Sequence, residues 1–171
     1  MSTPHHRRLP ASRLLNGAGL LTTLAAMLFA VLYLERTLGL EPCPLCIVDR
    51  LIILSMGALF LLALLHNPGR RGQRVYAGLN LALALAGIAT AGRHIWLQHL
   101  PPERVPECGA SLEFMLEHAP LPEVLDYILQ GSGECAAIQW SFLGLSIPEQ
   151  TLLLFAALAA LALIQLLRTD D

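Results

Sequence analysis

Two cysteines separated by two residues stand just before a long apolar segment, in the stretch EPCPLCIVDR at residues 41–50. The C-x-x-C spacing of Cys43 and Cys46 serves thiol–disulfide exchange, metal binding or a static crosslink in proteins. Its setting favours exchange, because a helix that begins at this proline-flanked site places partial positive charge near both thiols. Arg50 follows Cys46 by four residues, hence on the same helix face, and would also stabilise a thiolate.

The other two of the four cysteines, Cys108 and Cys135, stand 27 positions apart in a polar, acidic segment. Their glycine-flanked positions predict exposure to a partner. As a disulfide they could simply crosslink this segment, or they could exchange electrons with the first pair, since exchange needs only a thiolate and a reachable disulfide. A zinc site built from all four cysteines is a third interpretation, although Cys108 and Cys135 lack a C-x-x-C spacing of their own. The residues alone leave these alternatives open.

Membrane spans are the elements that must position these cysteines. Of the 171 residues, 55% are hydrophobic and 14% are charged, and the formal net charge is −2. This composition is more apolar than that of soluble domains and lacks the basic surface typical of nucleic-acid binding. Four segments are long and apolar enough for a transmembrane helix, which needs about 20 residues. They cover residues 14–34, 45–65, 75–97 and 148–167.

Arginines predict how the spans are oriented. They precede the first span, fill the loop between the second and third, and follow the fourth, at Arg7, Arg8, Arg13, Arg70, Arg71, Arg74 and Arg168. Because basic residues remain on the cytoplasmic side, both termini are expected in the cytoplasm and the loops 35–44 and 98–147 outside. All four cysteines then lie on the outer, oxidising side, where disulfides form.

These observations predict an all-α membrane protein: a single integral membrane domain, residues 1–171, in which four transmembrane helices form a bundle. A short helix is expected in the second outer loop at residues 122–130, where it either lies on the membrane surface or caps the bundle. In the third span, Gly78, Ala82 and Ala86 at four-residue spacing predict the face that packs closely against another helix. Asn80 predicts an interhelical hydrogen bond.

Two adjacent pairs of charged or titratable residues lie near the outer ends of the spans. Asp49 and Arg50 could anchor a helix at the interface, or could act on charge in the site, since ionisable residues at this depth are functional candidates. Arg93 and His94, near the outer end of the third span, have the same two interpretations.

With these motifs in place, the sequence resembles the disulfide bond formation protein B (DsbB) family, the quinone-reducing thiol oxidases of the bacterial inner membrane. The resemblance covers nearly the whole chain. It rests on PCPLCIVDR at the second span, RHIWLQHLP at the end of the third, Cys108 in the outer loop, and GSGECAAIQWSFLGLSIPEQ at the fourth.

The resemblance implies an electron relay through the disulfides Cys108–Cys135 and Cys43–Cys46. A periplasmic thioredoxin-like thiol oxidase of the DsbA type would be reoxidised through a mixed disulfide with Cys108, and Cys135 would then exchange with Cys43. Cys46 would meet the electron acceptor, ubiquinone or menaquinone, with Arg50 and His94 beside the quinone ring. The resemblance implies no metal.

Two other functional classes are consistent with the residues alone. One is a four-helix membrane scaffold or transporter whose outer loop is merely crosslinked, and the other is a zinc-stapled membrane protein with reduced thiols.

Overall fold

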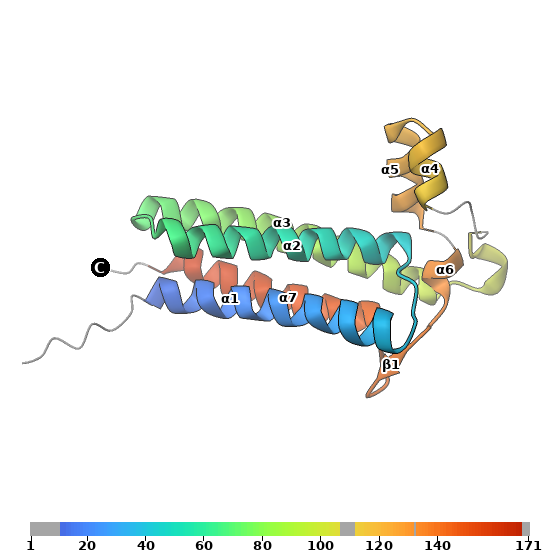
Figure 1. Cartoon of the computed structure of the whole chain (residues 1–171), viewed down its shortest axis with the longest axis horizontal. Coiled ribbons are helices and arrows are strands. Elements are labelled where there is room, and N and C mark those ends of the chain that lie inside the picture. The colour runs from blue at the N-terminus through green and yellow to red at the C-terminus, as the bar shows by residue number, and fades with distance from the viewer. Residues whose placement is uncertain (1–10, 107–111, 132, 169–171) are drawn as a thin grey trace, which may run out of the picture.

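The computed structural model describes residues 11–106, 112–131 and 133–168 of the chain. Four long helices lie side by side, and the shorter elements gather at one end of them (Figure 1). The long helices are α1 (Ala11–Leu28), which continues as the π-helix η1 (Phe29–Thr37), then α2 (Pro44–His66), α3 (Arg70–Gln98) and α7 (Ile147–Leu167). With α1 and η1 taken together, all four are long and apolar enough to cross a membrane. The prediction of an all-α membrane bundle with four spanning helices is confirmed.

Three of the arginines that predict the orientation share one end of this bundle. Helix α1 begins and α7 ends at the end opposite to the short elements, and the turn from α2 to α3 lies there too (Figure 1). Arg70, Arg71 and Arg74 stand in the first turns of α3 at this end. Arg7 and Arg8 lie outside the described residues.

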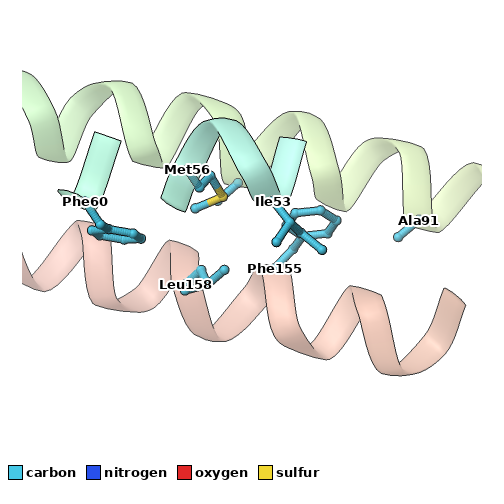
Figure 2. Close-up of a cluster of buried hydrophobic side chains, with 7 residues drawn as sticks. Ile53, Met56, Phe60, Ala91, Phe155 and Leu158 are labelled. Atoms are coloured by element: carbon cyan, nitrogen blue, oxygen red, sulfur yellow. The ribbon is translucent and has the colours of Figure 1, made fainter. Parts of the chain in front are cut away.

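Apolar side chains from three helices fill the middle of the bundle (Figure 2). Phe60 of α2 and Phe155 of α7 are fully buried. A Cβ on Gly87 would overlap the Phe155 ring, so the missing side chain of this glycine is what lets α7 approach α3. The remaining members of the cluster are Ile53, Met56, Ala84, Ala91 and Leu158.

The packing face of α3 differs from the predicted one. Ala82 and Ala86 are exposed, and a Cβ on Gly78 would meet nothing within 4 Å, so the predicted stripe is wrong. The buried face is instead rotated around the helix and consists of Ala77, Asn80, Ala84, Gly87, Ala91, His94 and Leu97. Asn80 is buried on this face, but its amide has no hydrogen-bond partner among the described residues, contrary to expectation. The same face carries His94 to the cysteine end of the bundle.

Short elements cap that end. They are η2 (Pro102–Arg104), α4 (Leu112–His118), α5 (Leu121–Gln130), α6 (Gly133–Ala136) and an antiparallel hairpin of β1 (Ser141–Phe142) and β2 (Leu145–Ser146). Helix α5 is the short helix expected in this loop. It contacts α2, its Val124 is buried, and the Gln130 carbonyl accepts a hydrogen bond from Arg93. The short helix is therefore attached to the bundle.

A hydrogen-bonded cap fixes the start of α7 against the end of α3. The Glu149 carboxylate accepts from the backbone N–H of Ser146 at 2.6 Å, which completes a capping box. The Ser146 hydroxyl also donates to the Gln98 side chain at 2.9 Å. Since β2 ends at Ser146, this cap also holds the hairpin beside the cysteine end of the bundle.

Candidate active site

The first turn of α2 presents Cys43 and Cys46 together. Cys43 is the N-cap residue, and its sulfur accepts a hydrogen bond from the Cys46 backbone N–H at 3.3 Å. Pro44 takes the first helical position, where its lack of an N–H costs nothing. The two sulfur atoms are 2.7 Å apart. This local geometry follows directly from the sequence PCPLC and places both thiols at the mouth of a membrane span, as predicted.

Cys135 reaches the same place from the outer loop. It lies on the short helix α6, is completely buried, and packs against Cys43, Leu45 and Leu97. The chain enters α6 through Gly131, whose φ of +76° is readily adopted only by glycine, and a Cβ there would overlap Leu97. The expected proximity of Cys135 to Cys43 is thus present, whereas the expected exposure of Cys135 is wrong, because the loop folds down onto the bundle.

Contact with Cys135 also changes the acidity of Cys43. Hydrogen bonding with the Cys135 thiol, then hydrogen bonding with Cys46 and burial, raises the pKa of Cys43 above its ordinary value. Cys43 therefore keeps its proton in the reduced cluster. The helix N-terminus alone predicts the opposite effect, and it is outweighed here by the neighbouring thiols.

His94 joins the cluster from α3. Its Nε2 atom is 3.8 Å from the Cys43 sulfur, and its side chain is 3% exposed. Its Nδ1 atom is buried without a hydrogen-bond partner among the described residues. His94 therefore lies at the cysteine pair, on the buried face of α3.

An apolar cavity of about 160 Å³ opens on the other side of Cys46. Cys46, Arg50 and His94 line it, and Cys46 is the only cysteine among the described residues of its wall. Apolar side chains from η1, the long helices and the segment just before β1 make up much of the rest, among them Met27, Phe29, Leu34, Trp140 and Leu154. Trp140 closes one side by packing against the rings of Phe29 and Tyr33, at centroid distances of 5.9 and 6.2 Å. Such a site suits a flat apolar ligand with a few polar atoms.

Two polar contacts at this cavity could not be predicted from the sequence. Arg50 forms an ion pair with Glu35 of η1, and Thr90 of α3 donates a hydrogen bond to the buried Asp49 carboxylate. Glu35 stands 15 residues from Arg50, so no helical spacing connects them. The available signal was one acidic residue at the outer end of the first span, at the depth of Arg50.

The fourth cysteine lies outside the described residues. Cys108 therefore has no position here, and its pairing with Cys135 stays a prediction, as does the Cys43–Cys46 disulfide. Of the predicted site residues, the structure brings together Cys43, Cys46, Cys135 and His94, with Arg50 on the adjoining cavity. The donor atoms of Cys43, Cys46 and His94 also lie close enough together to hold a metal ion.

Comparison with known proteins assigns the family. Residues 12–165 match the family model described as disulfide bond formation protein DsbB. The chain is 49% identical to disulfide bond formation protein B of Methylococcus capsulatus over 141 residues, 82% of this chain and 86% of that protein. It is 50% identical to the protein of that name from Nitrosococcus oceani over 147 residues, 85% of this chain and 87% of the relative. The protein of that name from Acinetobacter baumannii is 48% identical over 157 residues, 91% of each chain. The chain therefore belongs to the DsbB family of disulfide bond formation proteins and is a membrane-embedded, disulfide-forming oxidoreductase.

Proposed function

We propose that this protein reoxidises a periplasmic, thioredoxin-like dithiol oxidase of the DsbA type and passes the electrons to a membrane quinone. It does so as a single integral domain of the bacterial inner membrane, with both termini in the cytoplasm and its cysteines on the periplasmic side. Turnover of this kind would sustain disulfide formation in the periplasm, where disulfides persist.

One observation carries the proposal: the two sulfurs of the C-x-x-C have different neighbours. Cys43 packs against Cys135, whereas Cys46 lines the apolar cavity. The sulfurs themselves are 2.7 Å apart. A pair arranged in this way can receive electrons through one sulfur and deliver them through the other. A disulfide that merely crosslinks a scaffold does not need its two sulfurs to have different neighbours.

The relay consists of thiol–disulfide exchanges in which each attacking thiolate replaces a leaving thiolate. A thiolate of the partner attacks Cys108 of the Cys108–Cys135 disulfide and releases Cys135 as a thiolate. The partner's second thiol then resolves the mixed disulfide, so the partner leaves oxidised and Cys108 is a thiol. The Cys135 thiolate attacks Cys43, which breaks the Cys43–Cys46 bond and releases Cys46 as a thiolate.

Cys108 then completes the transfer within the protein. Its thiolate attacks Cys135 in the Cys43–Cys135 disulfide, which restores Cys108–Cys135 and releases Cys43. The net result is that two electrons and two protons have moved from the partner's dithiol to Cys43 and Cys46. His94 lies beside Cys43, at 3.8 Å, in position to exchange a proton with the leaving sulfur.

The cavity next to Cys46 fits a quinone. Its wall is largely apolar, and the guanidinium of Arg50 supplies a permanent cation at a depth where charge is poorly screened. A quinone bound there would accept two electrons and two protons from the reduced pair. Arg50 would hold a ring oxygen and offset the negative charge on the Cys46 thiolate, and Trp140 would shield the site from water.

The arginine distribution supports the orientation. Arg70, Arg71 and Arg74 stand at the end of the bundle opposite to the cysteines, as do the start of α1 and the end of α7. Retention of basic residues in the cytoplasm then places the cysteines outside.

The test reconstitutes the purified chain with a reduced DsbA-type protein and a water-soluble quinone analogue. We expect one quinone reduced for each partner dithiol oxidised, followed through the quinone absorbance and the free thiols of the partner. Cys46→Ser should oxidise at most one equivalent of partner and reduce no quinone, because Cys43 then has no disulfide partner facing the cavity. Quinone reduction by this variant at the parent's rate would overturn the proposal.

A further inference from the structure

A second, much smaller cavity lies on the side of the cysteine pair that faces the outer loop. It measures about 20 Å³, and Cys43, Cys46 and His94 all line it, together with Gln98 and Glu134. The sulfur atoms of the two cysteines and a ring nitrogen of His94 lie within 4.8 Å of one another. A volume of roughly 10–15 Å³ is enough for one water molecule, so this cavity has room for a single ion.

The donor set selects a particular kind of ion. Thiolate sulfur and imidazole nitrogen are the preferred ligands of Zn²⁺, and C-x-x-C is the usual spacing of two zinc-binding cysteines. In a tetrahedral site with bonds of about 2.3 Å to sulfur and 2.0–2.1 Å to nitrogen, a sulfur and a nitrogen stand roughly 3.5–3.6 Å apart. The Nε2 atom of His94 is already 3.8 Å from the Cys43 sulfur. The two sulfur atoms, now 2.7 Å apart, have to separate for an ion to enter between them.

His94 is suited to this role for a second reason. It is only 3% exposed, and its Nδ1 atom has no hydrogen-bond partner among the described residues. Burying a polar group without a hydrogen-bond partner is unfavourable. A bound cation would fix the Nε2 lone pair on the metal and the proton on Nδ1, where a water molecule or a small shift of a neighbour can accept it.

We propose that the reduced protein binds one Zn²⁺ through Cys43, Cys46 and His94, and that the bound ion switches the relay off. Binding displaces one proton from each thiol and changes no oxidation state. The fourth coordination position is left to water, as in zinc sites with three protein ligands. The oxidised protein is expected not to bind, because sulfurs joined in a disulfide are no longer thiolates.

The consequence for the relay follows from the same contacts. A zinc-bound Cys43 cannot be attacked by Cys135, and a zinc-bound Cys46 cannot deliver electrons to the larger cavity. Zinc would therefore capture the protein when its dithiol accumulates, which happens whenever the electron acceptor is scarce. This inhibitory effect rests on the proposed function, whereas the binding itself does not. A constitutive zinc staple of four cysteines would differ on every point: it would include Cys108, omit His94 and persist at all times.

The experiment measures zinc binding by the full-length protein without partner or quinone. The starting variant carries His5→Ala and His6→Ala, which removes a pair of tail histidines that could bind metal on their own. Reduced and oxidised samples are titrated without oxygen against a chromogenic zinc chelator, and the protons released are counted. We expect one zinc and two protons per reduced chain, and no zinc bound by the oxidised chain.

Matched variants locate the site. Cys43→Ala and Cys46→Ala should each abolish stoichiometric zinc binding. His94→Ala should lower the zinc affinity by about tenfold or more, because the loss of even a residue that only supports a metal ligand lowers metal affinity about 10- to 100-fold. Cys108→Ala and His99→Ala remove donors of the same kinds outside the ligand set and should bind as the starting variant does. Equal binding by the oxidised chain, or binding that survives both Cys43→Ala and Cys46→Ala, would refute the proposal.

A kinetic measurement tests the switch separately. Zinc at saturating concentration should slow oxidation of the reduced chain by a quinone analogue by at least tenfold, and a chelator should restore the rate. The same assay in metal-free buffer reports on the electron relay alone. If the protein reduces quinone but binds no zinc, the zinc site is refuted and the proposed function stands. If it binds zinc but reduces no quinone in metal-free buffer, the proposed function is refuted and the zinc site stands.

Discussion

Arg50 of α2 forms an ion pair with Glu35, which lies in the π-helical turns that end the first span. The two side chains are 20% and 27% exposed, so the pair is only partly buried. A π-helix advances by more residues per turn than an α-helix and is frequent at functional sites. The wider turns of η1 thus bring the Glu35 carboxylate from the first span to Arg50 of the proposed quinone cavity. The ion pair fixes the position of the Arg50 side chain.

Glu35→Gln should therefore raise the apparent KM for quinone about two- to fivefold with little change in kcat. Partly exposed ion pairs contribute about 0.2–1 kcal/mol, which corresponds to a change of this size. Steady-state kinetics with a quinone analogue measure the effect. Glu41→Gln is the control, since Glu41 lines the same cavity outside the ion pair. A parent-like KM in Glu35→Gln would restrict Glu35 to anchoring the helix.

Arg50→Gln should have a larger effect at the same step. Hydrogen bonds to charged groups contribute about 1.5–3 kcal/mol, so we expect the apparent quinone affinity to fall about tenfold or more and quinone reduction to slow. The variant should fold, keep both disulfides and still exchange with the soluble partner, because Arg50 lies on the cavity and not at Cys135. If a folded Arg50→Gln protein reduced quinone with the parent's kinetics, Arg50 would be only an anchor.

The loop pair is tested by trapping. In Cys135→Ser, Cys108 has lost its disulfide partner, so its thiolate should attack the disulfide of the oxidised DsbA-type partner. The bond between the partner's two sulfurs breaks, one of them leaves as a thiolate, and the mixed disulfide with Cys108 should be visible as an adduct on non-reducing gels. Cys108→Ser should form none. Oxidation of the partner by Cys108→Ser, together with no adduct in Cys135→Ser, would show that the two roles are assigned wrongly.

Topology can be checked with a membrane-impermeant thiol reagent on intact, reduced spheroplasts. A variant that retains Cys108 as its sole cysteine should be labelled from outside. A cysteine-free chain carrying Arg71→Cys, at the opposite end of the bundle, should be labelled only after the membrane is disrupted. The reverse pattern would overturn the orientation and, with it, the proposed function.

The packing face of α3 predicts a contrast between two glycines. Gly87→Ala should lower the melting temperature in detergent, because its Cβ would overlap the Phe155 ring and overpacking costs about 1–3 kcal/mol. Gly78→Ala should be neutral or slightly stabilising, since the space around Gly78 is open and alanine favours helix. Equal melting temperatures for the two variants would contradict the arrangement of α3 and α7.

The comparison of these glycines shows what the sequence can predict. Span positions and the cysteine pair at a helix start follow from hydropathy, proline and spacing, and all were predicted. The rotation of α3 about its axis was not, because a span that is apolar on every side carries no amphipathic signal to separate its lipid face from its packed face. The same limit hid the buried position of Asn80.

The contacts between helices are unpredictable for a related reason. Glu35 with Arg50 and Thr90 with Asp49 join residues from different spans, and a single sequence does not specify how those spans are placed relative to one another. The π-helical turns of η1 add a further shift that no local pattern indicates. The fold of the outer loop onto the bundle, which buries Cys135, likewise depends on contacts with Leu45 and Leu97 that are remote in sequence.

That burial has a consequence for the selectivity of the enzyme. Cys135 is 0% exposed and Cys43 is 4% exposed, so small thiols in solution have almost no direct access to either sulfur. Exchange requires a thiolate to approach a sulfur in line. Adventitious reductants such as glutathione therefore have almost no direct route to Cys43 or Cys135, and the step that joins these two sulfurs is protected from small thiols in solution.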